Sequence, residues 1–269
     1  MRQPLLTLTT DFGASDHYVG AMKGVILSIC PHAQIVDICH DVTPYQIAEG
    51  AYVIAQAYDC FPNKTVHVVV VDPGVGTARR PILVEAAGQY FVGPDNGVLS
   101  MVYACAMHKV RVIANERYFR QPVSATFHGR DIFAPVAAHL AAGVPPARIG
   151  KPITDYLRPE FAQPRRIAER TWSGSILKID RFGNVVTNLH VSDFPELRQS
   201  GTDAFVCQPV MKIGRRKIAA LARNYAACSP GVPFLIVGSS GYLEVSVNQG
   251  SAAKQLRCAA GQPVKLTMG

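Results

Sequence analysis

A run of apolar residues that stops at an acid constrains the fold of this chain more than any other feature. The run Val66 to Val71 is followed by Asp72-Pro73-Gly74-Val75-Gly76, with Arg79 and Arg80 close behind. Such a pattern is typical of a buried strand that carries a carboxylate to the carboxyl edge of a sheet, where open α/β sheets bind their ligands. Glycines in the loop leave room for the backbone to approach a ligand. Asp72 and Arg79 therefore form either a structural ion pair or part of a chemical site.

Strand-like and helix-like segments alternate through the first half of the chain. The segments expected to be strands are Leu5–Thr9, Ile35–Ile38, Val66–Val71 and a hairpin of Ile82–Ala86 with Gln89–Val92. The expected helices are one around Tyr18–Ile29, capped by Ser15 or Asp16, and Ile47–Ala57, Val98–Met107 and Ile132–Ala142. Alternation of this kind predicts a mostly parallel sheet flanked by helices. We assign residues 1–150 to this N-terminal α/β domain.

The character of the sequence changes after the first domain. Five prolines fall between residues 145 and 164, and a dense proline segment suits a semi-rigid connector, which we place at residues 151–170. Short strand-like runs separated by glycine and proline turns follow, at Ile176–Ile179, Val185–Leu189, Phe205–Cys207, Phe234–Val237, Tyr242–Val247 and Val264–Leu266. Residues 171–269 are therefore predicted to form a smaller, mostly antiparallel and barrel-like β domain.

Composition excludes several classes of protein. The net charge of the 269 residues is +8, but the 27 basic residues are scattered, which argues against a nucleic-acid-binding protein. The seven cysteines include no Cys-x-x-Cys pair, so neither a disulfide framework nor a zinc knuckle is expected. No apolar run reaches about 18 residues, and the N-terminus has no signal-peptide pattern. We expect a soluble cytoplasmic protein without a membrane partner.

A second acid stands where a strand ends. Thr9-Thr10-Asp11-Phe12-Gly13 repeats the pattern of the opening segment, and a carboxylate in this position often accepts hydrogen bonds from ribose hydroxyls. The alternative is a helix cap, which is the weaker interpretation for Asp11 and an equal one for Asp16. Gly-x-Gly-x-x-Gly does not occur here, and no Gly-Lys-Ser/Thr follows Gly74 and Gly76. Neither a Rossmann site nor a P-loop is supported.

Two histidines lie beside predicted element ends. His40, in Asp37-Ile38-Cys39-His40-Asp41, shares no metal-ligand spacing with the other histidines, so we interpret it as a hydrogen-bonded supporting residue and expect no metal. His128 precedes the predicted helix from Ile132, with Asp131 in the first turn or at its cap. A catalytic and a structural role for His128 are equally open. In the second half, the loops Asp180–Asn184 and Gly238–Glu244 are either ordinary turns or polar recognition loops.

Taken in order, these segments resemble one family, the S-adenosyl-L-methionine hydroxide adenosyltransferases, which are related to fluorinating and chlorinating enzymes. The resemblance runs from about Leu6 to Leu256. The motifs that carry it are Thr10-Asp11-Phe12-Gly13, Tyr18-Val19-Gly20-Ala21-Met22-Lys23-Gly24, Val71-Asp72-Pro73-Gly74-Val75-Gly76, Pro94-Asp95-Asn96-Gly97, His128-Gly129-Arg130-Asp131, Phe182-Gly183-Asn184 and Ser239-Ser240-Gly241-Tyr242-Leu243-Glu244.

The resemblance implies hydrolysis of S-adenosylmethionine to adenosine and L-methionine without a cofactor. It also implies a homotrimer in which the C-terminal domain completes the site of the neighbouring subunit. The family's catalytic triad matches Asp72, Arg79 and His128. The implied substrate-binding residues are Asp11 for the ribose diol, Tyr45 beside the substrate, Asp180 and Ser239 for the methionine amino group, Asn184 for the adenine, and Tyr242 and Glu244 in the Ser239 loop.

This chain differs from the halogenating relatives at two positions that separate hydrolysis from halogenation. Those relatives carry a tyrosine where this chain has Asp72 and a halide-binding serine where it has Gly129. A carboxylate beside the reacting carbon repels a halide but hydrogen-bonds to water, so the resemblance favours hydrolysis. The alternatives are a 5′-halogenating adenosyltransferase, a nucleoside-binding protein without turnover, and a metal hydrolase that uses His40 and the neighbouring acids.

Overall fold

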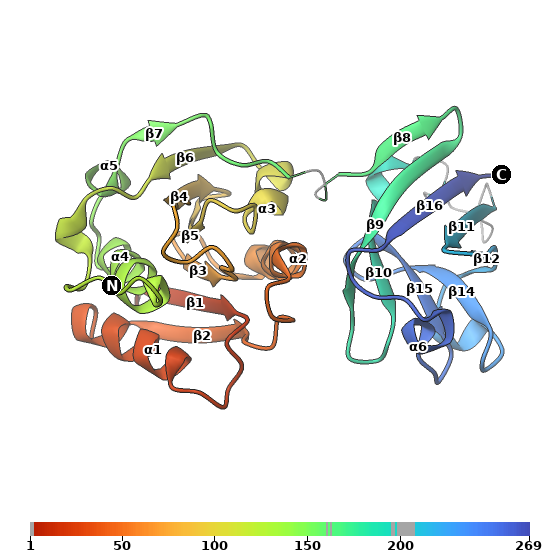
Figure 1. The fold of residues 1–269 in the computed structure, drawn as a ribbon, viewed down its shortest axis with the longest axis horizontal. Helices are drawn as coiled ribbons and strands as arrows, with labels where there is room; N and C mark the ends of the chain where they lie inside the picture. Colours follow the sequence, from red (N-terminus) through yellow and green to blue (C-terminus); the bar gives the residue numbers. More distant parts are fainter. Residues whose placement is uncertain (1–2, 160, 162, 195–196, 198–207) are drawn as a thin grey trace. The chain divides into compact units, whose positions relative to one another are not determined.

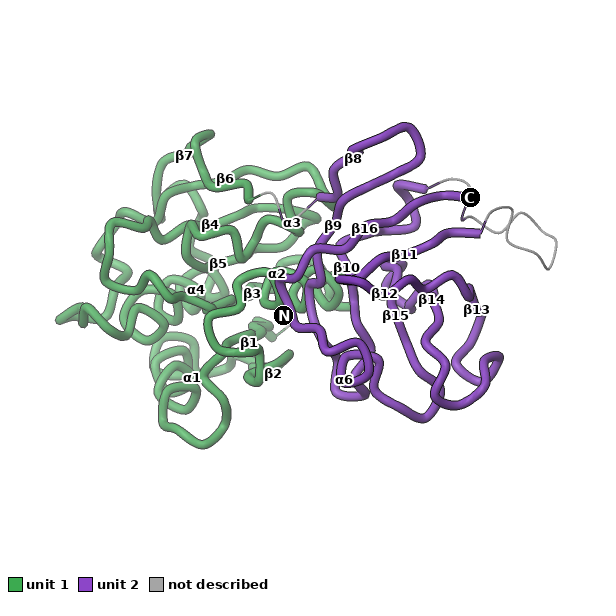
Figure 2. The backbone as a smooth tube through the Cα atoms, turned by 45° about the vertical axis from the view of Figure 1, so that its right-hand side comes forward, with its two compact units in different colours: residues 1–159 green, residues 160–269 purple. Residues whose placement is uncertain are grey.

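The computed structural model describes residues 3–159, 161, 163–194, 197 and 208–269. The chain divides into two compact units, residues 1–159 and residues 160–269, which are coloured separately in Figure 2. Each unit contains its own sheet and its own apolar core. The predicted fold class, an α/β domain followed by a β domain, is confirmed.

Unit 1 is built on a seven-stranded sheet with strand order β2-β1-β3-β5-β4-β6-β7 (Figure 1). Its strands are β1 (Leu5–Thr10), β2 (Gln34–Cys39), β3 (Val66–Val70), β4 (Pro81–Ala86), β5 (Gln89–Pro94), β6 (His108–Val112) and β7 (Pro152–Ile153). The strands from β2 to β5 in this order pair in parallel, and the pairs on the other side, from β5 to β7, are antiparallel. The carboxyl ends of β1, β2 and β3 therefore share one edge.

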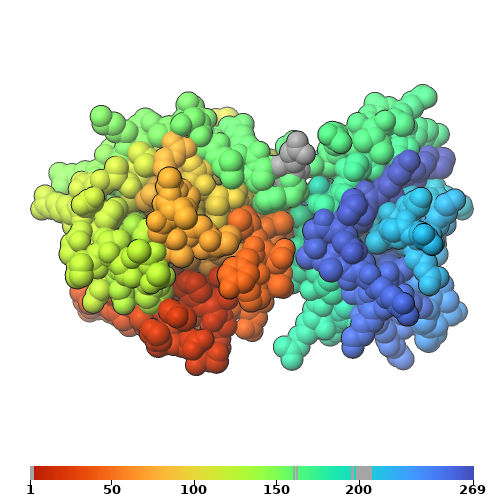
Figure 3. Space-filling model, in the orientation of Figure 1, coloured from red at the N-terminus to blue at the C-terminus, as the bar shows by residue number. Residues whose placement is uncertain are grey.

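Helices cover both faces of this sheet. They are α1 (Tyr18–Ile29), α2 (Ile47–Ala57), α3 (Ser100–Cys105), α4 (Ala134–Ala141) and the short α5 (Pro146–Ile149). Val66, Val68 and Val70 pack in the cluster that contains α1 and α4, whereas Val69 and Val71 pack in the cluster that contains α2 and α3. Figure 3 shows α1, in red, on the lower surface of unit 1. Because both faces are covered, β3 is buried at every position and its sequence, VHVVV, does not alternate between apolar and polar residues.

The hairpin of β4 and β5 follows from its turn. Ala87 and Gly88 both have positive φ, 50° and 73°, which is the requirement of a type I′ turn and matches the right-handed twist of the strands. The predicted cap of α1 is wrong. His17 stands at the N-cap, without a side-chain cap hydrogen bond, so neither Ser15 nor Asp16 supplies one.

Unit 2 is a nine-stranded, mostly antiparallel sheet. Its strands are β8 (Arg165–Ala168), β9 (Thr171–Ile179), β10 (Val185–His190), β11 (Pro209–Ile213), β12 (Arg216–Ile218), β13 (Leu221–Ala222), β14 (Pro233–Val237), β15 (Tyr242–Val247) and β16 (Pro263–Met268), with one helix, α6 (Ala252–Leu256). The order is β12-β11-β16-β9-β10-β15-β14-β13, with β8 beside β9. The sheet curls enough for β12 to approach β14, and its inner face is apolar.

The proline-rich segment predicted as a connector contributes to both sheets. β7 lies in unit 1 and β8 in unit 2, and the units divide between residues 159 and 160. The predicted strand Phe205–Cys207 lies outside the described residues.

Candidate active site

Asp72 stands at the carboxyl edge of the first sheet, two residues beyond β3. The strand end is anchored by Asn96, whose Nδ2 donates to the Val71 carbonyl at 2.8 Å and whose Oδ1 accepts from the Val98 N–H at 3.1 Å. The Pro94–Gly97 segment therefore holds the backbone that precedes Asp72. Its composition is that of a turn, and the turn lies at the edge of the site.

Asp72, Arg79 and His128 are brought together by unit 1. Arg79 Nε donates to both Asp72 oxygens at 2.9 Å, and Arg79 Nη2 donates to Asp72 Oδ2 at 2.5 Å. The same Nη2 lies 2.6 Å from His128 Nδ1. The Asp72 and Arg79 side chains are only 4% and 8% exposed, and the guanidinium lies 5.4 Å from the centre of the Phe133 ring. The result is a buried, bidentate ion pair with a histidine attached.

The contact with Arg79 fixes the protonation of His128. A guanidinium has donors and no acceptor, so His128 Nδ1 must be the acceptor and the ring proton must sit on Nε2. Burial, followed by the Arg79 charge, lowers the pKa of His128, against smaller opposing effects of Asp72 and Asp131. His128 is therefore a neutral imidazole at neutral pH, with an Nε2–H available as a donor.

Two loops must approach closely to form this contact. Gly76 has φ +77°, and a Cβ at this position would lie 2.2 Å from the Ala125 carbonyl oxygen. Gly76 therefore allows the Ala125–His128 segment to approach, whereas the sequence suggested an approach of the loop backbone to a ligand. Asp131 accepts from the Ser124 N–H at 2.9 Å and pairs with Arg120 and Arg130. His128 precedes the π-helical segment Gly129–Phe133, in whose first turn Asp131 lies.

Asp11 follows β1 at the same sheet edge. Its Oδ2 accepts the Tyr45 N–H at 2.9 Å. Burial raises the pKa of Asp11, and the charge of Asp72 adds to that effect, so the two carboxylates influence each other. Tyr45 has φ +68° and its side chain is 72% exposed. A non-glycine residue in this conformation is strained, and such strain is concentrated at functional sites.

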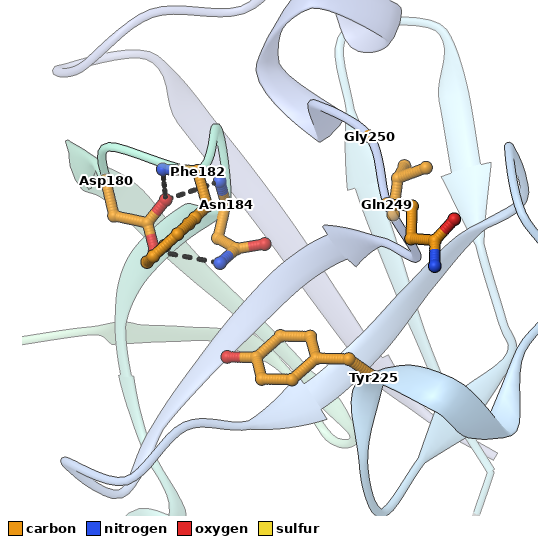
Figure 4. A pocket seen from close by; sticks show the side chains of 7 residues that line it. Asp180, Phe182, Asn184, Tyr225, Gln249 and Gly250 are labelled. Atoms are coloured by element: carbon orange, nitrogen blue, oxygen red, sulfur yellow. Dashed lines mark hydrogen bonds between the residues drawn. The ribbon is translucent and has the colours of Figure 1, made fainter.

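Two of the predicted residues of unit 2, Asp180 and Asn184, line a pocket in that unit. This pocket, of about 530 Å³, is lined by Asp180, Phe182, Asn184, Tyr225, Val247, Gln249 and Gly250. Figure 4 shows the Asp180–Asn184 turn on one side and Gln249 with Gly250 on the other. Asp180 Oδ1 accepts the N–H groups of Phe182 at 2.9 Å and Asn184 at 2.8 Å, and Oδ2 accepts from Asn184 Nδ2 at 2.8 Å. Asp180 therefore shapes the turn that it belongs to.

Glu244 is a buried carboxylate near this pocket, 7% exposed. Burial, and then the charge of Asp180, raise its pKa to about 7, while a hydrogen bond with Tyr225 opposes the rise. Ser239 lies exposed in the turn between β14 and β15, and the Tyr242 ring lies 4.8 Å from the His190 ring in an edge-on contact. Neither Ser239, Tyr242 nor Glu244 lines the pocket itself.

Other chemistry-bearing candidates have structural partners. Arg80 pairs with Asp95 and Asp155, as expected of a structural charge. Within the described residues, no cluster of His, Cys, Asp and Glu has the geometry of a metal site. No described helix combines the length and the apolar character needed to cross a bilayer.

Comparisons with known proteins agree on one family. Residues 6–150 match the SAM hydroxide adenosyltransferase N-terminal domain, and residues 174–265 match the SAM hydroxide adenosyltransferase C-terminal domain. The chain belongs to the SAM hydroxide adenosyltransferase family. The (R)-S-adenosyl-L-methionine hydrolase of Salinispora tropica is 37% identical, over 99% of this chain and 98% of that protein. A fluorinase of Nocardia brasiliensis is 29% identical, over 100% of this chain and 98% of its own length.

A solved structure extends the similarity to three dimensions. The crystal structure of an uncharacterized conserved protein from Thermotoga maritima has a TM-score of 0.85 and 37% sequence identity, covering 97% of this chain and 99% of that one. The predicted membership of the SAM hydroxide adenosyltransferase family is confirmed. The roles assigned to individual residues stay predictions.

Sequence reasoning missed part of the pocket in this SAM hydroxide adenosyltransferase. Tyr225 lies in a short 3-10 segment with no distinguishing sequence pattern. Gln249 and Gly250 follow β15, and Gln249 has φ +53°. The Asn248-Gln249-Gly250 composition indicates a turn, but turn composition alone does not indicate a pocket.

Proposed function

We propose that this chain hydrolyses S-adenosyl-L-methionine to adenosine and L-methionine by attack of a water oxygen on the ribose C5′. The O–C5′ bond forms, the C5′–S bond breaks with its electron pair going to sulfur, and the water gives up one proton. The sulfonium leaves as a neutral thioether, so no general acid is required. The difficulty is the nucleophile, because bulk water has a pKa of about 15.7.

The observation that carries the proposal is the contact of Asp72, Arg79 and His128 at the sheet edge. His128 presents only an N–H to the site, and Arg79 has only donors, so Asp72 is the member of the triad with lone pairs left to accept a water proton. The remaining N–H groups of Arg79 and the Nε2–H of His128 then stabilise the developing hydroxide. Holding water in line with C5′ contributes about 7–11 kcal/mol in favourable cases.

The substrate is a cation, and each of the remaining predicted residues is assigned to its ribose, its methionine ammonium or its adenine. Asp11 accepts the ribose hydroxyls, with Tyr45 beside them. Asp180 and Ser239 take the methionine ammonium, Asn184 takes the adenine, and Tyr242 and Glu244 support that loop. Following the family resemblance, we propose a homotrimer in which Asp180, Asn184, Ser239, Tyr242 and Glu244 complete the site of a neighbouring subunit. The strong exposure of Tyr45 and Phe182, 72% and 78%, supports such a role for their loops.

The proposal includes no cofactor and a cytoplasmic location. Hydrolysis at a sulfonium carbon needs no redox group. The cysteines that the structure describes are unpaired, as suits a reducing compartment.

Incubation with S-adenosylmethionine in ¹⁸O-labelled water tests the reaction. We expect one label at the adenosine 5′-hydroxyl, together with L-methionine. Asp72→Ala is expected to abolish adenosine release and leave S-adenosylmethionine binding nearly intact. Unlabelled adenosine, or turnover by this variant near the wild-type rate, would contradict the mechanism. Parallel incubation with chloride or fluoride that gives 5′-halo-adenosine in place of adenosine would show a halogenating enzyme.

A further inference from the structure

His40 contacts the loop that carries Asp11. The His40 ring Nδ1 is 2.8 Å from Thr10 Oγ1, and the His40 carbonyl accepts the Gly13 N–H at 2.8 Å. The Thr10 hydroxyl also accepts the Phe12 N–H at 3.3 Å. His40 therefore contacts the chain on both sides of Asp11, at Thr10 before it and at Gly13 after it, and the Thr10 hydroxyl also holds Phe12.

The topology makes this contact possible. β1 and β2 are parallel neighbours, so Thr10 at the end of β1 and His40 just beyond β2 meet at one sheet edge. The pairing is irregular between Leu8 and Thr9, and Thr9 pairs with Cys39. Thr10 is fully buried, and the His40 side chain is 11% exposed. A buried hydroxyl left without its partner costs about 1–3 kcal/mol, so the Thr10–His40 pair fixes the local backbone firmly.

A carboxylate lies at the other end of the imidazole. His40 Nε2 lies 3.1 Å from Asp37 Oδ1, and Lys23 Nζ lies 2.6 Å from Asp37 Oδ2. Burial raises the pKa of Asp37, but the contacts with Lys23 and His40 outweigh that effect and lower it. An anionic Asp37 favours the tautomer with the proton on Nε2, which leaves Nδ1 free to accept the Thr10 hydroxyl proton.

We propose that His40 is a positioning residue for recognition of the ribose diol. By holding the Thr10 hydroxyl through Nδ1 and the Gly13 N–H through its carbonyl, it fixes the turn that aims Asp11. A carboxylate must be held within about 0.5 Å of its productive place to discriminate a diol. The proposal rests on the proposed role of Asp11 as the ribose ligand. It adds that this specificity depends on a side chain that never touches the substrate.

Direct nucleoside binding tests the proposal without turnover. The ratio of the Kd of 2′,3′-dideoxyadenosine to the Kd of adenosine, measured by calorimetry, isolates the contribution of the diol. His40→Asn and His40→Gln form a matched pair, because asparagine places an amide atom near the Nδ1 position whereas glutamine reaches the Nε2 position. Thr10→Val removes the partner hydroxyl with little change of shape.

We expect the wild type to prefer adenosine. His40→Asn keeps that preference, whereas His40→Gln and Thr10→Val each reduce it about tenfold, with similar Kd values for the dideoxynucleoside. Thermal denaturation establishes that each variant is folded. If His40→Gln and Thr10→Val keep the wild-type ratio, or weaken both nucleosides equally, His40 is only structural and the proposal is wrong. If the wild type does not prefer adenosine, the ribose role of Asp11 fails first, and the role of His40 with it.

Discussion

Asp72 in unit 1 lies 2.5 Å from a guanidinium nitrogen, whereas Asp180 in unit 2 is held by N–H groups. Burial, and then the charge of Asp180, raise the pKa of Glu244. Unit 1 pairs Asp72 with the guanidinium of Arg79, whereas uncharged N–H donors hold Asp180 in unit 2.

The difference separates two tasks. A neutralised and rigid Asp72–Arg79–His128 group presents a fixed pattern of donors and lone pairs to a water molecule, which suits chemistry. Two carboxylates that lie close enough to interact, Asp180 and Glu244, attract a cationic ligand, which suits binding of an ammonium or a sulfonium. Variants of the Asp72–Arg79–His128 group should therefore change kcat and folding, and variants of Asp180 should change KM.

Removing the guanidinium tests unit 1 and has the largest expected effect. Arg79→Met leaves Asp72 buried and unpaired, which destabilises the fold by about 3–5 kcal/mol. It also removes the donor to His128, so we expect kcat to fall by about 10²–10³-fold. Urea unfolding and steady-state kinetics measure both quantities. Arg80→Met, which breaks a more exposed pair, is the control, and equal losses of kcat in the two variants would contradict the comparison.

Removing one carboxylate from unit 2 should weaken binding. Asp180→Asn keeps an oxygen for the Phe182 and Asn184 N–H groups but loses the charge that we assign to the ammonium. A hydrogen bond to a charged group contributes about 1.5–3 kcal/mol, so KM for S-adenosylmethionine should rise about 10- to 100-fold with kcat nearly unchanged. Asp193→Asn, at an exposed position of the same unit, serves as the control. A loss confined to kcat would reverse the division between the units.

The smallest effect is a pH dependence of binding. Because the pKa of Glu244 is about 7, it gains a proton as the pH falls from 8 to 6, and one negative charge near the cationic ligand is lost. The expected loss of affinity is roughly fivefold, from about 1 kcal/mol of Coulomb energy. Calorimetric titration of S-adenosylmethionine across this range measures it, and Glu244→Gln should bind with little change over the same range. If the affinity of the wild type does not change with pH, the charge of Glu244 does not contribute to binding of the ligand.

The raised pKa of Glu244 also predicts how the stability of the folded protein depends on pH. The pKa of Glu244 in the folded protein lies above the value of about 4.5 expected in the unfolded chain. Protonated Glu244 therefore adds to the free energy of unfolding below pH 4.5, and this stabilisation is lost as the pH rises through 7. Glu244→Gln should remove this slope from the urea unfolding of the protein.

Much of unit 1 could be predicted because its signals are local. The apolar run of β3 and the Ala87-Gly88 turn each specify their structure within a few residues. The contact of Asp72 with Arg79 also spans only seven residues. His128 joins them across 49 residues, and nothing near it in the sequence shows that Gly76 admits its loop. Only the family resemblance connected these residues before the structure did.

The pocket of unit 2 was harder to predict, because its residues come from segments that are far apart in the sequence. Phe182 and Asn184 belong to one recognisable turn, but Tyr225 and Gln249 line the pocket from segments more than 40 residues further along the chain. The cap of α1 also escaped prediction, since serine and aspartate near a helix start are favourable candidates even where the backbone leaves them outside.

Gly129 sets a practical limit on redesign of this enzyme. A Cβ there would lie 3.2 Å from Met22 Sδ and 3.3 Å from the Phe127 ring, closer than most side chains approach. A serine placed there to bind a halide therefore requires the Met22 side chain or the Phe127 ring to shift by a few tenths of an ångström. The barrier between the two chemistries is then a matter of volume shared by three segments as much as of the charge on Asp72.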